Sequence, residues 1–203
     1  SLERFLYVSS GEVYGNGDVD NWKESDSGYV DCMTLRSCYP TSKRAAETLC
    51  VAYSHQFHIE AVVARPCHTY GPHFTDNDTR AYAQFVRNAR NHEDIVLKSR
   101  GEQYRSWLYV KDCASAILTI LLKGQNGEAY NVADVNSCVT IRELAEAIAH
   151  IGGSKVVFDL PSEVERQGFS VIRKAVFDTS KLEALEWIPQ YKLQEALVET
   201  IKG

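Results

Sequence analysis

The sequence contains no long hydrophobic run, which argues against a membrane-spanning helix. Its longest apolar stretch lies near residues 116–122, whereas about 20 apolar residues are needed to cross a bilayer. The first residues also lack a basic segment followed by an apolar one, so we expect no secretory signal. These absences predict a chain that has no membrane partner and that works in the cytoplasm.

Positive charge is also in short supply. The 22 basic residues are outnumbered by 27 acidic ones, the net charge is −5 at pH 7, and lysine and arginine form no stripe. Nucleic-acid-binding domains carry a basic patch that neutralises phosphates, so we expect no nucleic acid as a main partner. With 203 residues, 44% of them hydrophobic, the chain can bury one sizeable core, or a core and a smaller satellite.

No two cysteines form a C-x-x-C pair, so the sequence offers little support for a zinc site or a disulfide framework. We expect reduced thiols in a cytosol-like compartment. His55 and His58 could share a helix face, but no third metal ligand accompanies them, so no metal site is expected. The six cysteines are Cys32, Cys38, Cys50, Cys67, Cys113 and Cys138.

The order of apolar patterns near the start predicts a βαβ unit. Residues 2–9 are nearly continuous in apolar side chains, which is typical of a buried parallel strand. A polar loop follows over 15–37, and loops of that length are usually functional. Pro40 then opens a helix to about Phe57, and residues 59–65 form a second strand. The unit should have a right-handed crossover.

The remaining chain alternates predicted helices and short strands, which makes the class α/β. Thr140 should cap one helix in a capping box with Glu143, and Gly152-Gly153 should end it. Residues 163–166 read as a solvated face. The predicted helices cover 79–91, 110–122, 140–151, 180–185 and 193–201, and the strands 95–98, 107–109, 129–132 and 156–158.

One motif of dinucleotide-binding α/β domains is missing. Such a domain opens with a strand and a G-x-G-x-x-G turn that holds the phosphates at a helix N-terminus. The sequence contains no such turn. Its first strand therefore reads as one from the middle of a sheet.

Tyr39 and Lys43 lie four residues apart at the start of the predicted helix. On one helix face, a lysine ammonium favours the phenolate of a tyrosine, which can then take a proton from a substrate hydroxyl as hydride leaves the same carbon. Ser10, at the end of the preceding strand, could hydrogen-bond both the phenol and a substrate oxygen. An exposed pair without function is the alternative when Tyr39 and Lys43 are taken alone.

At this point the sequence resembles the extended short-chain dehydrogenase/reductase family, specifically its NAD-dependent nucleotide-sugar epimerases, dehydratases and decarboxylases. The resemblance covers essentially the whole chain. The motifs that carry it, in order, are VSSGEVYG (8–15), YPTSK (39–43), RPCHTYGP (65–72), GEQYRSWLYVKD (101–112), YNVA (130–133), FDTSKL (177–182) and LEWIP (185–189).

The resemblance implies a fold and a division of the chain. Family members are longer, and this chain matches their later part, from the fifth strand of the Rossmann sheet onward. We therefore expect the C-terminal part of a Rossmann-type parallel sheet plus a smaller α/β substrate-binding domain. Residues 1–75 would be a remnant of the NAD-binding domain, with helix 110–122 packing back on it, and 76–203 mainly the sugar-nucleotide-binding domain. As a fragment the chain should be inactive, and full length it should be a homodimer that uses NAD.

The resemblance also assigns roles to individual residues. Tyr39 is the proton-transfer residue at the C4 hydroxyl of the sugar, Lys43 holds the nicotinamide ribose, and Ser10 orients the substrate. The expected cofactor contacts are Ser9, Tyr39, Lys43, Arg65 and Pro66. The expected contacts to the nucleotide-sugar substrate are Glu12, His68, Arg80 and Arg105, although the family usually has asparagine in place of His68.

Glu12 distinguishes the chemistries within the family. Dehydratases of dTDP-glucose carry an Asp-Glu pair where this sequence has Gly11-Glu12, and UDP-glucuronate decarboxylases keep the glutamate without the aspartate. The expectation therefore leans toward decarboxylase or dehydratase chemistry through transient C4 oxidation. The alternatives are a nucleotide-sugar 4-epimerase, a truncated non-catalytic module that binds a sugar nucleotide or dimerises, and a Glu12 that only caps the next turn.

Overall fold

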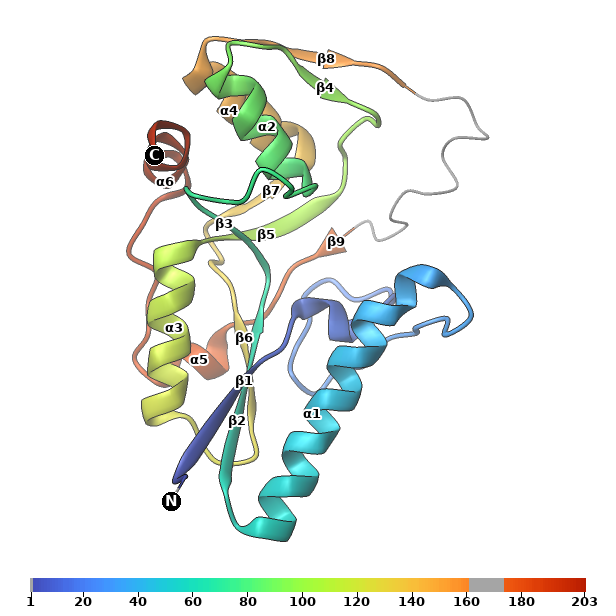
Figure 1. Cartoon of the computed structure of the whole chain (residues 1–203), viewed down its shortest axis with the longest axis vertical. Coiled ribbons are helices and arrows are strands. Elements are labelled where there is room, and N and C mark those ends of the chain that lie inside the picture. Colours follow the sequence, from blue (N-terminus) through green and yellow to red (C-terminus); the bar gives the residue numbers. More distant parts are fainter. Residues whose placement is uncertain (1, 161–173) are drawn as a thin grey trace.

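A parallel sheet with a helix on each side forms one half of the molecule (Figure 1). The computed structural model describes residues 2–160 and 174–203. In the sheet, β2 (Glu60–Pro66) lies between β1 (Arg4–Val8) and β6 (Ala129–Val132), and all three run parallel. Helix α1 (Cys38–Phe57) and helix α3 (Val110–Lys123) flank it on opposite sides. The βαβ unit and the Rossmann-type parallel sheet are confirmed.

The core of this half lies between the sheet and α3. Val62 and Ala64 of β2 are fully buried against Ala116 and Ile120 of α3. Fully burying a valine or isoleucine side chain stabilises a fold by about 1.5–3 kcal/mol. Strand β6 and helix α3 both come from beyond residue 75, so this half draws on the later part of the chain as well.

The expectation that the first strand is buried was wrong. Phe5 and Val8 of β1 are exposed, because among the described strands β1 pairs only with β2 and forms the edge of the sheet. The apolar run in the sequence predicts that β1 is a strand, but it does not predict how many other strands pair with it.

Helix α1 also buries little of its apolar face. Leu49, Tyr53 and Phe57 are each more than half exposed, and Pro40 is its one buried residue. Polar side chains that reach from the helix to the sheet and to the preceding loop hold it in place, as described below.

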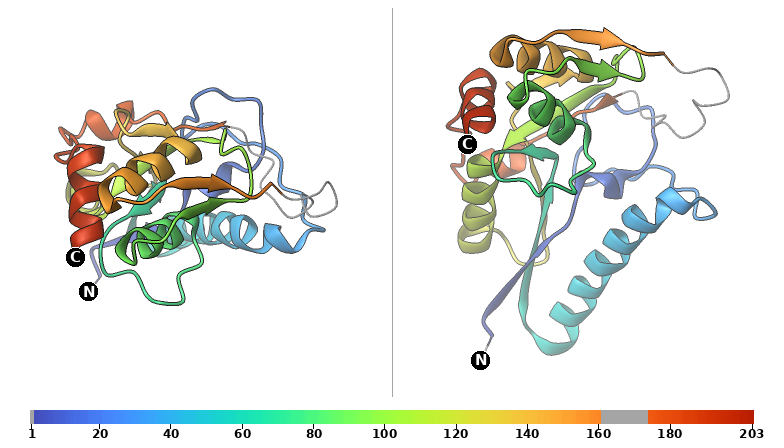
Figure 2. Two further views of the ribbon diagram at one scale, coloured as in Figure 1. Left: turned by 90° about the horizontal axis from the view of Figure 1, so that it is seen from above. Right: turned by 45° about the horizontal axis from the view of Figure 1, so that its top comes forward.

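The other half of the molecule is a smaller α/β unit (Figure 2). A four-stranded sheet and a two-stranded one pack with three helices around a core that includes Trp107, Leu144 and Ile148. The strands are β3 (His68–Tyr70), β5 (Tyr104–Tyr109), β7 (Cys138–Thr140) and β9 (Lys174–Ala175) in one sheet and β4 (Ile95–Leu97) and β8 (Val156–Phe158) in the other, and the helices are α2 (Ala81–Arg90), α4 (Ile141–Gly152) and α6 (Leu193–Lys202).

Several local predictions are confirmed here. Thr140 and Glu143 form the expected capping box at the start of α4, and Gly153 ends the helix in the left-handed conformation. Trp107 and Tyr109 are buried, as packing residues should be. Strands β3, β7 and β9 were missed because each is only two or three residues long and, unlike the equally short β4 and β8, none is a continuous run of large apolar residues.

The structure also bears on the predictions for the cysteines, for metal ligands and for the short helix near residue 180. All six cysteines are free thiols. In the part of the chain that the structure describes, no cluster of side chains could hold a metal ion, and no helix is long and apolar enough to span a bilayer. The short helix α5 (Ser180–Glu183) begins where it was predicted. The predicted solvated face at 163–166 lies outside the described residues.

Candidate active site

The site begins where β1 ends. Ser9 and Ser10 follow the strand, and a 3-10 helix, η1 (Gly11–Tyr14), starts at once. Ser10 caps this helix, because its Oγ accepts a hydrogen bond of 3.2 Å from the Glu12 N–H. The cap fixes Glu12 in the first turn, at the carboxyl end of the sheet, where open α/β sheets bind their ligands.

Tyr39 and Lys43 stand at the same end of the sheet, in the first turns of α1. The Lys43 ammonium donates to the Val8 carbonyl at 2.9 Å and lies 5.6 Å from the centre of the Tyr39 ring. Tyr39 is 48% exposed, and its hydroxyl has no partner among the described residues, so it is open to a substrate. The structure thus places the ammonium between the strand end and the phenol, as the spacing of the two residues suggested.

Arg44 ties η1 to α1 and was missed by the sequence analysis. Its guanidinium donates to the carbonyls of Val13 at 2.6 Å, Tyr14 at 3.1 Å and Gly28 at 2.9 Å. One side chain of α1 therefore sets the position of the turn that carries Glu12. No sequence signal marks Arg44, since its partners are main-chain atoms of a loop.

Arg65 was expected near the cofactor, and the structure places its side chain in a buried network. Nε and Nη2 bind the two oxygens of Glu47 at 3.0 and 2.7 Å, and Nη1 donates to the Tyr14 hydroxyl at 3.0 Å. The Tyr14 hydroxyl donates in turn to Asn131 at 2.7 Å. A contact of Arg65 and the adjoining Pro66 with a cofactor stays a prediction, and the main chain at the end of β2 is where it would occur.

Two arginines and one histidine lie near Glu12. Arg36, on the 3-10 helix η2 (Leu35–Ser37), has its Nη2 3.7 Å from Glu12 Oε1. Arg105 of β5 is only 5% exposed. Burial and the charge of Arg36 lower its pKa, and the charge of Glu12 partly opposes this change. Burial and the charges of Arg105, Arg36 and Arg80 lower the pKa of His68 to about 4. His68 is therefore neutral at pH 7.

This cluster is suited to anions. The His68 ring lies tilted against Trp107, with the ring centres 5.3 Å apart, and part of the side chain reaches solvent. The two arginines around Glu12 leave an excess of positive charge, which attracts phosphate and carboxylate groups. The structure thus brings together Glu12, His68 and Arg105, and it adds Arg36, for which the sequence analysis had no signal.

Arg80 is engaged differently from the other arginines. Its Nε and Nη2 bind the carboxylate of Asp78 at 3.0 and 2.6 Å, and this guanidinium lowers the pKa of Asp78 to about 2. Part of the charge of Arg80 is thereby neutralised within the chain. Its contact with a diphosphate stays a prediction.

Gly11 is held by close packing. A Cβ added at Gly11 would lie 2.5 Å from the tip of the Phe177 ring, and Phe177 is itself buried with Val13, Tyr14 and Trp22. Real carbon atoms do not approach so closely, so any side chain at position 11 requires the Phe177 ring to move. The glycine that stands here in place of the dehydratases' aspartate is therefore packed against the Phe177 ring.

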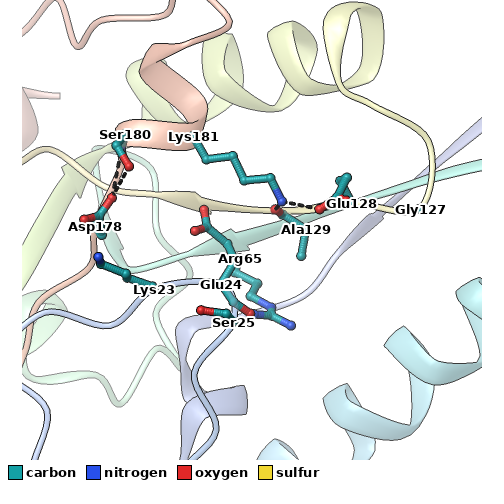
Figure 3. Close-up of a pocket in the computed structure, with 10 residues that line it drawn as sticks. All are labelled: Lys23, Glu24, Ser25, Arg65, Gly127, Glu128, Ala129, Asp178, Ser180 and Lys181. Carbon is teal, nitrogen blue, oxygen red and sulfur yellow. Dashed lines mark hydrogen bonds and ion pairs between the residues drawn. The ribbon is translucent and has the colours of Figure 1, made fainter.

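A separate polar cavity of about 500 Å³ lies beside β6 (Figure 3). Several of its charged groups bind one another or the main chain: Lys181 donates to Glu128 and to the Ala129 carbonyl, and Glu24 accepts from the Asn131 N–H at 2.7 Å. These contacts join the tail of the chain to the first sheet.

Comparison with known proteins identifies the chain. Residues 1–133 match the model of the NAD dependent epimerase/dehydratase family. The chain belongs to this family. The resemblance drawn from the sequence motifs is therefore confirmed, as is the α/β fold class.

Relatives in the family include sugar-nucleotide decarboxylases and dehydratases. UDP-glucuronic acid decarboxylase 5 of Arabidopsis thaliana is 34% identical over 198 residues, which are 96% of this chain and 55% of the relative. The dTDP-glucose 4,6-dehydratase of Bacillus anthracis, solved in complex with NAD, is 26% identical with a TM-score of 0.80 and covers 97% of this chain and 60% of that one. The chain thus spans about half the length of the curated relative.

A third relative bears on the fold alone. The UDP-glucose 4-epimerase of Thermotoga maritima has a TM-score of 0.85 at 23% identity and covers 98% of this chain and 62% of that one. The same backbone therefore serves epimerases as well as dehydratases, so the fold does not separate the chemistries.

The residues assigned to the cofactor of this NAD-dependent family fit the sugar part of a dinucleotide. The Ser9 hydroxyl is buried and lacks a hydrogen-bond partner in the described part of the chain. Lys43 uses one of its three N–H donors on Val8 and keeps two. Both lie at the end of β1, so a ribose bearing two hydroxyls could bind there.

Proposed function

We propose that the full-length protein is an NAD-dependent decarboxylase of a nucleotide-linked uronic acid, with UDP-glucuronate as substrate. The observation that carries the proposal is the placement of Glu12 and Tyr39 at one sheet end, with no room for a second carboxylate at Gly11. The 34% identity to a UDP-glucuronic acid decarboxylase supports it.

In the proposed reaction the protein residues bind, orient and transfer protons. NAD, which Ser9 and Lys43 would hold, would supply the hydride acceptor for the sugar C4 and the hydride donor that restores it. Tyr39 takes the proton of the C4 hydroxyl, the Lys43 ammonium stabilises its phenolate, and Ser10 orients the sugar oxygen. The resulting 4-keto acid loses carbon dioxide, and the C–C bonding electrons pass to the C4 oxygen. C5 loses the carboxyl group and gains a proton from solvent, which Glu12 delivers in this proposal.

The packing around Gly11 favours decarboxylation over dehydration. Dehydration of dTDP-glucose needs an acid that protonates the departing C6 hydroxyl, and relatives of that kind carry an aspartate at this position. Here the tip of the Phe177 ring lies 2.5 Å from the place of the Cβ of that side chain, so an aspartate would require the ring to move. Decarboxylation has no departing hydroxyl, so it needs no such acid.

The product formed from UDP-glucuronate tests the proposal. Full-length protein incubated with NAD and UDP-glucuronate should release carbon dioxide and form UDP-xylose, and Glu12→Gln should lower this rate at least 100-fold. dTDP-glucose should give no 4-keto-6-deoxy product. Carbon dioxide release that survives Glu12→Gln would reject the role of Glu12, and a C4-inverted product without carbon dioxide would make the protein an epimerase.

We also propose that residues 1–203 alone do not catalyse the decarboxylation of UDP-glucuronate. The sequence contains no glycine-rich phosphate turn, and β1 presents an open edge among the described strands. The 203-residue chain and the full-length protein should be assayed side by side. Turnover by the 203-residue chain would contradict this proposal without affecting that of the reaction.

The exposed face of α1 supports a homodimer of the full-length protein. Leu49, Tyr53 and Phe57 lie along it, each more than half exposed, and apolar patches of this kind mark interfaces. Light scattering should give a dimer that Leu49→Glu converts to a monomer. The six free thiols support a reducing, cytosol-like compartment.

A further inference from the structure

Arg36 lies beside the proposed reaction centre, yet the reaction described above does not use it. Its ion pair with Glu12, at 3.7 Å, is too long for a hydrogen bond. Among the described residues, this ion pair is the one polar contact of the Arg36 side chain. Its guanidinium donors are therefore available to a ligand that lies beside Glu12.

The backbone that carries Arg36 is held in place before any ligand binds. The hydroxyls of Thr34 and Ser37 lie 2.8 Å apart, and both donate to the Asp31 carbonyl. The Met33 N–H donates to the Asp31 carboxylate at 3.0 Å. These bonds close the loop directly before α1, so Arg36 is presented at a fixed distance from Tyr39.

Arg80 and Arg105, the other two arginines expected to contact the substrate, have different surroundings. Arg80 holds Asp78 in a two-point contact. Arg105 is buried in β5 and donates to the Tyr104 carbonyl at 3.0 Å. Arg36 is the arginine directly paired with Glu12, the residue placed beside C5 of the sugar.

A uronic acid bound beside Glu12 would bring a second negative charge close to the Glu12 carboxylate. Its carboxylate is attached to C5, so it comes close to the Glu12 carboxylate, and two carboxylates repel unless a cation lies between them. A guanidinium can bind a carboxylate at two points and keep another edge toward a second one. A neutral hexose needs no such cation.

We propose that Arg36 binds the carboxylate of the uronic acid and bridges it to Glu12, which makes Arg36 the residue that selects an acidic sugar. This inference rests on the proposed function. Because the carboxylate leaves as carbon dioxide, the contact is strongest before the chemical step. Loss of Arg36 should therefore raise KM much more than it lowers kcat.

Affinities of the full-length protein for UDP-glucuronate and UDP-xylose test the proposal, since the two differ by the carboxylate. The affinities are measured by calorimetry in a Tyr39→Phe background, because this substitution prevents turnover during the measurement. Arg36→Gln should weaken UDP-glucuronate binding about tenfold, the size of one hydrogen-bonded charge contact, and change UDP-xylose binding less than about twofold. Arg36→Lys should recover part of the loss.

Arg80→Gln is the matched control, because it removes a nearby arginine that is paired with Asp78 and not with Glu12. It should change the two affinities by the same factor. If Arg36→Gln also leaves their ratio unchanged, Arg36 does not bind the carboxylate. If the unsubstituted full-length protein forms no UDP-xylose from UDP-glucuronate, the proposed function fails first, and that result is read independently of Arg36.

Discussion

The Arg65 guanidinium holds both carboxylate oxygens of Glu47, at 3.0 and 2.7 Å, and so joins β2 to α1. Both side chains are nearly buried, with 13% and 14% exposed. Because α1 buries little apolar surface, this ion pair and the Lys43 bond to the Val8 carbonyl attach it to the sheet, and Arg44 attaches it to η1 and the following loop. The helix that presents Tyr39 is therefore positioned by polar contacts.

Removing one partner of this pair should be costly. Glu47→Ala leaves the Arg65 charge nearly buried and unpaired, and we expect it to lower the free energy of unfolding by about 3–5 kcal/mol. Denaturant unfolding measures the change. The control is Glu146→Ala on α4, whose partner Arg142 lies 2.7 Å away but with 55% and 47% of the two side chains exposed. It should cost less than about 0.5 kcal/mol, and equal costs would contradict the role of burial.

The close approach of Gly11 and Phe177 should appear as a coupling between the two positions. Gly11→Ala alone should destabilise the fold by about 1–3 kcal/mol, because its Cβ collides with the ring. In a Phe177→Leu background the same change should cost much less. A double-mutant cycle from unfolding curves gives the coupling. Additive costs would show that position 11 is not restricted by Phe177.

His68 should titrate at about pH 4 instead of its ordinary 6.5, as burial and the nearby arginines require. The folded protein then binds this proton less readily than the unfolded chain does. Stability should therefore fall as the pH drops from about 6.5 to about 4, and His68→Asn should reduce that slope. NMR titration of the ring measures the pKa directly. A value at or above 6.5 would mean that the arginine charges do not reach the ring.

Part of this site could be predicted from sequence because the βαβ order fixes it. A strand ending in Ser10 and a helix starting near Tyr39 must meet at the carboxyl edge of a parallel sheet, so the cluster follows from connectivity. Arg36 and Arg44 could not be found in this way. Their partners are Glu12 and the carbonyls of a loop, and the path of a loop leaves no period in the sequence.

Burial was the less predictable part of the fold. The apolar spacing of α1 correctly indicates a helix, but Leu49, Tyr53 and Phe57 on that face are each more than half exposed. The same holds for Phe5 and Val8 at the open edge of β1. A pattern shows which side of an element is apolar, and only the neighbouring elements decide whether that side is covered.

The turnover of Tyr39→Phe on UDP-glucuronate, measured in the full-length protein with its unfolding curve, tests the account most directly. The Tyr39 hydroxyl has no partner among the described residues, and the ring is 48% exposed, so the substitution should leave the free energy of unfolding within about 0.5 kcal/mol. Loss of the proton acceptor should lower kcat by about 100-fold to 10,000-fold. A Tyr39→Phe protein that folds equally well and releases carbon dioxide at the unsubstituted rate would contradict the account.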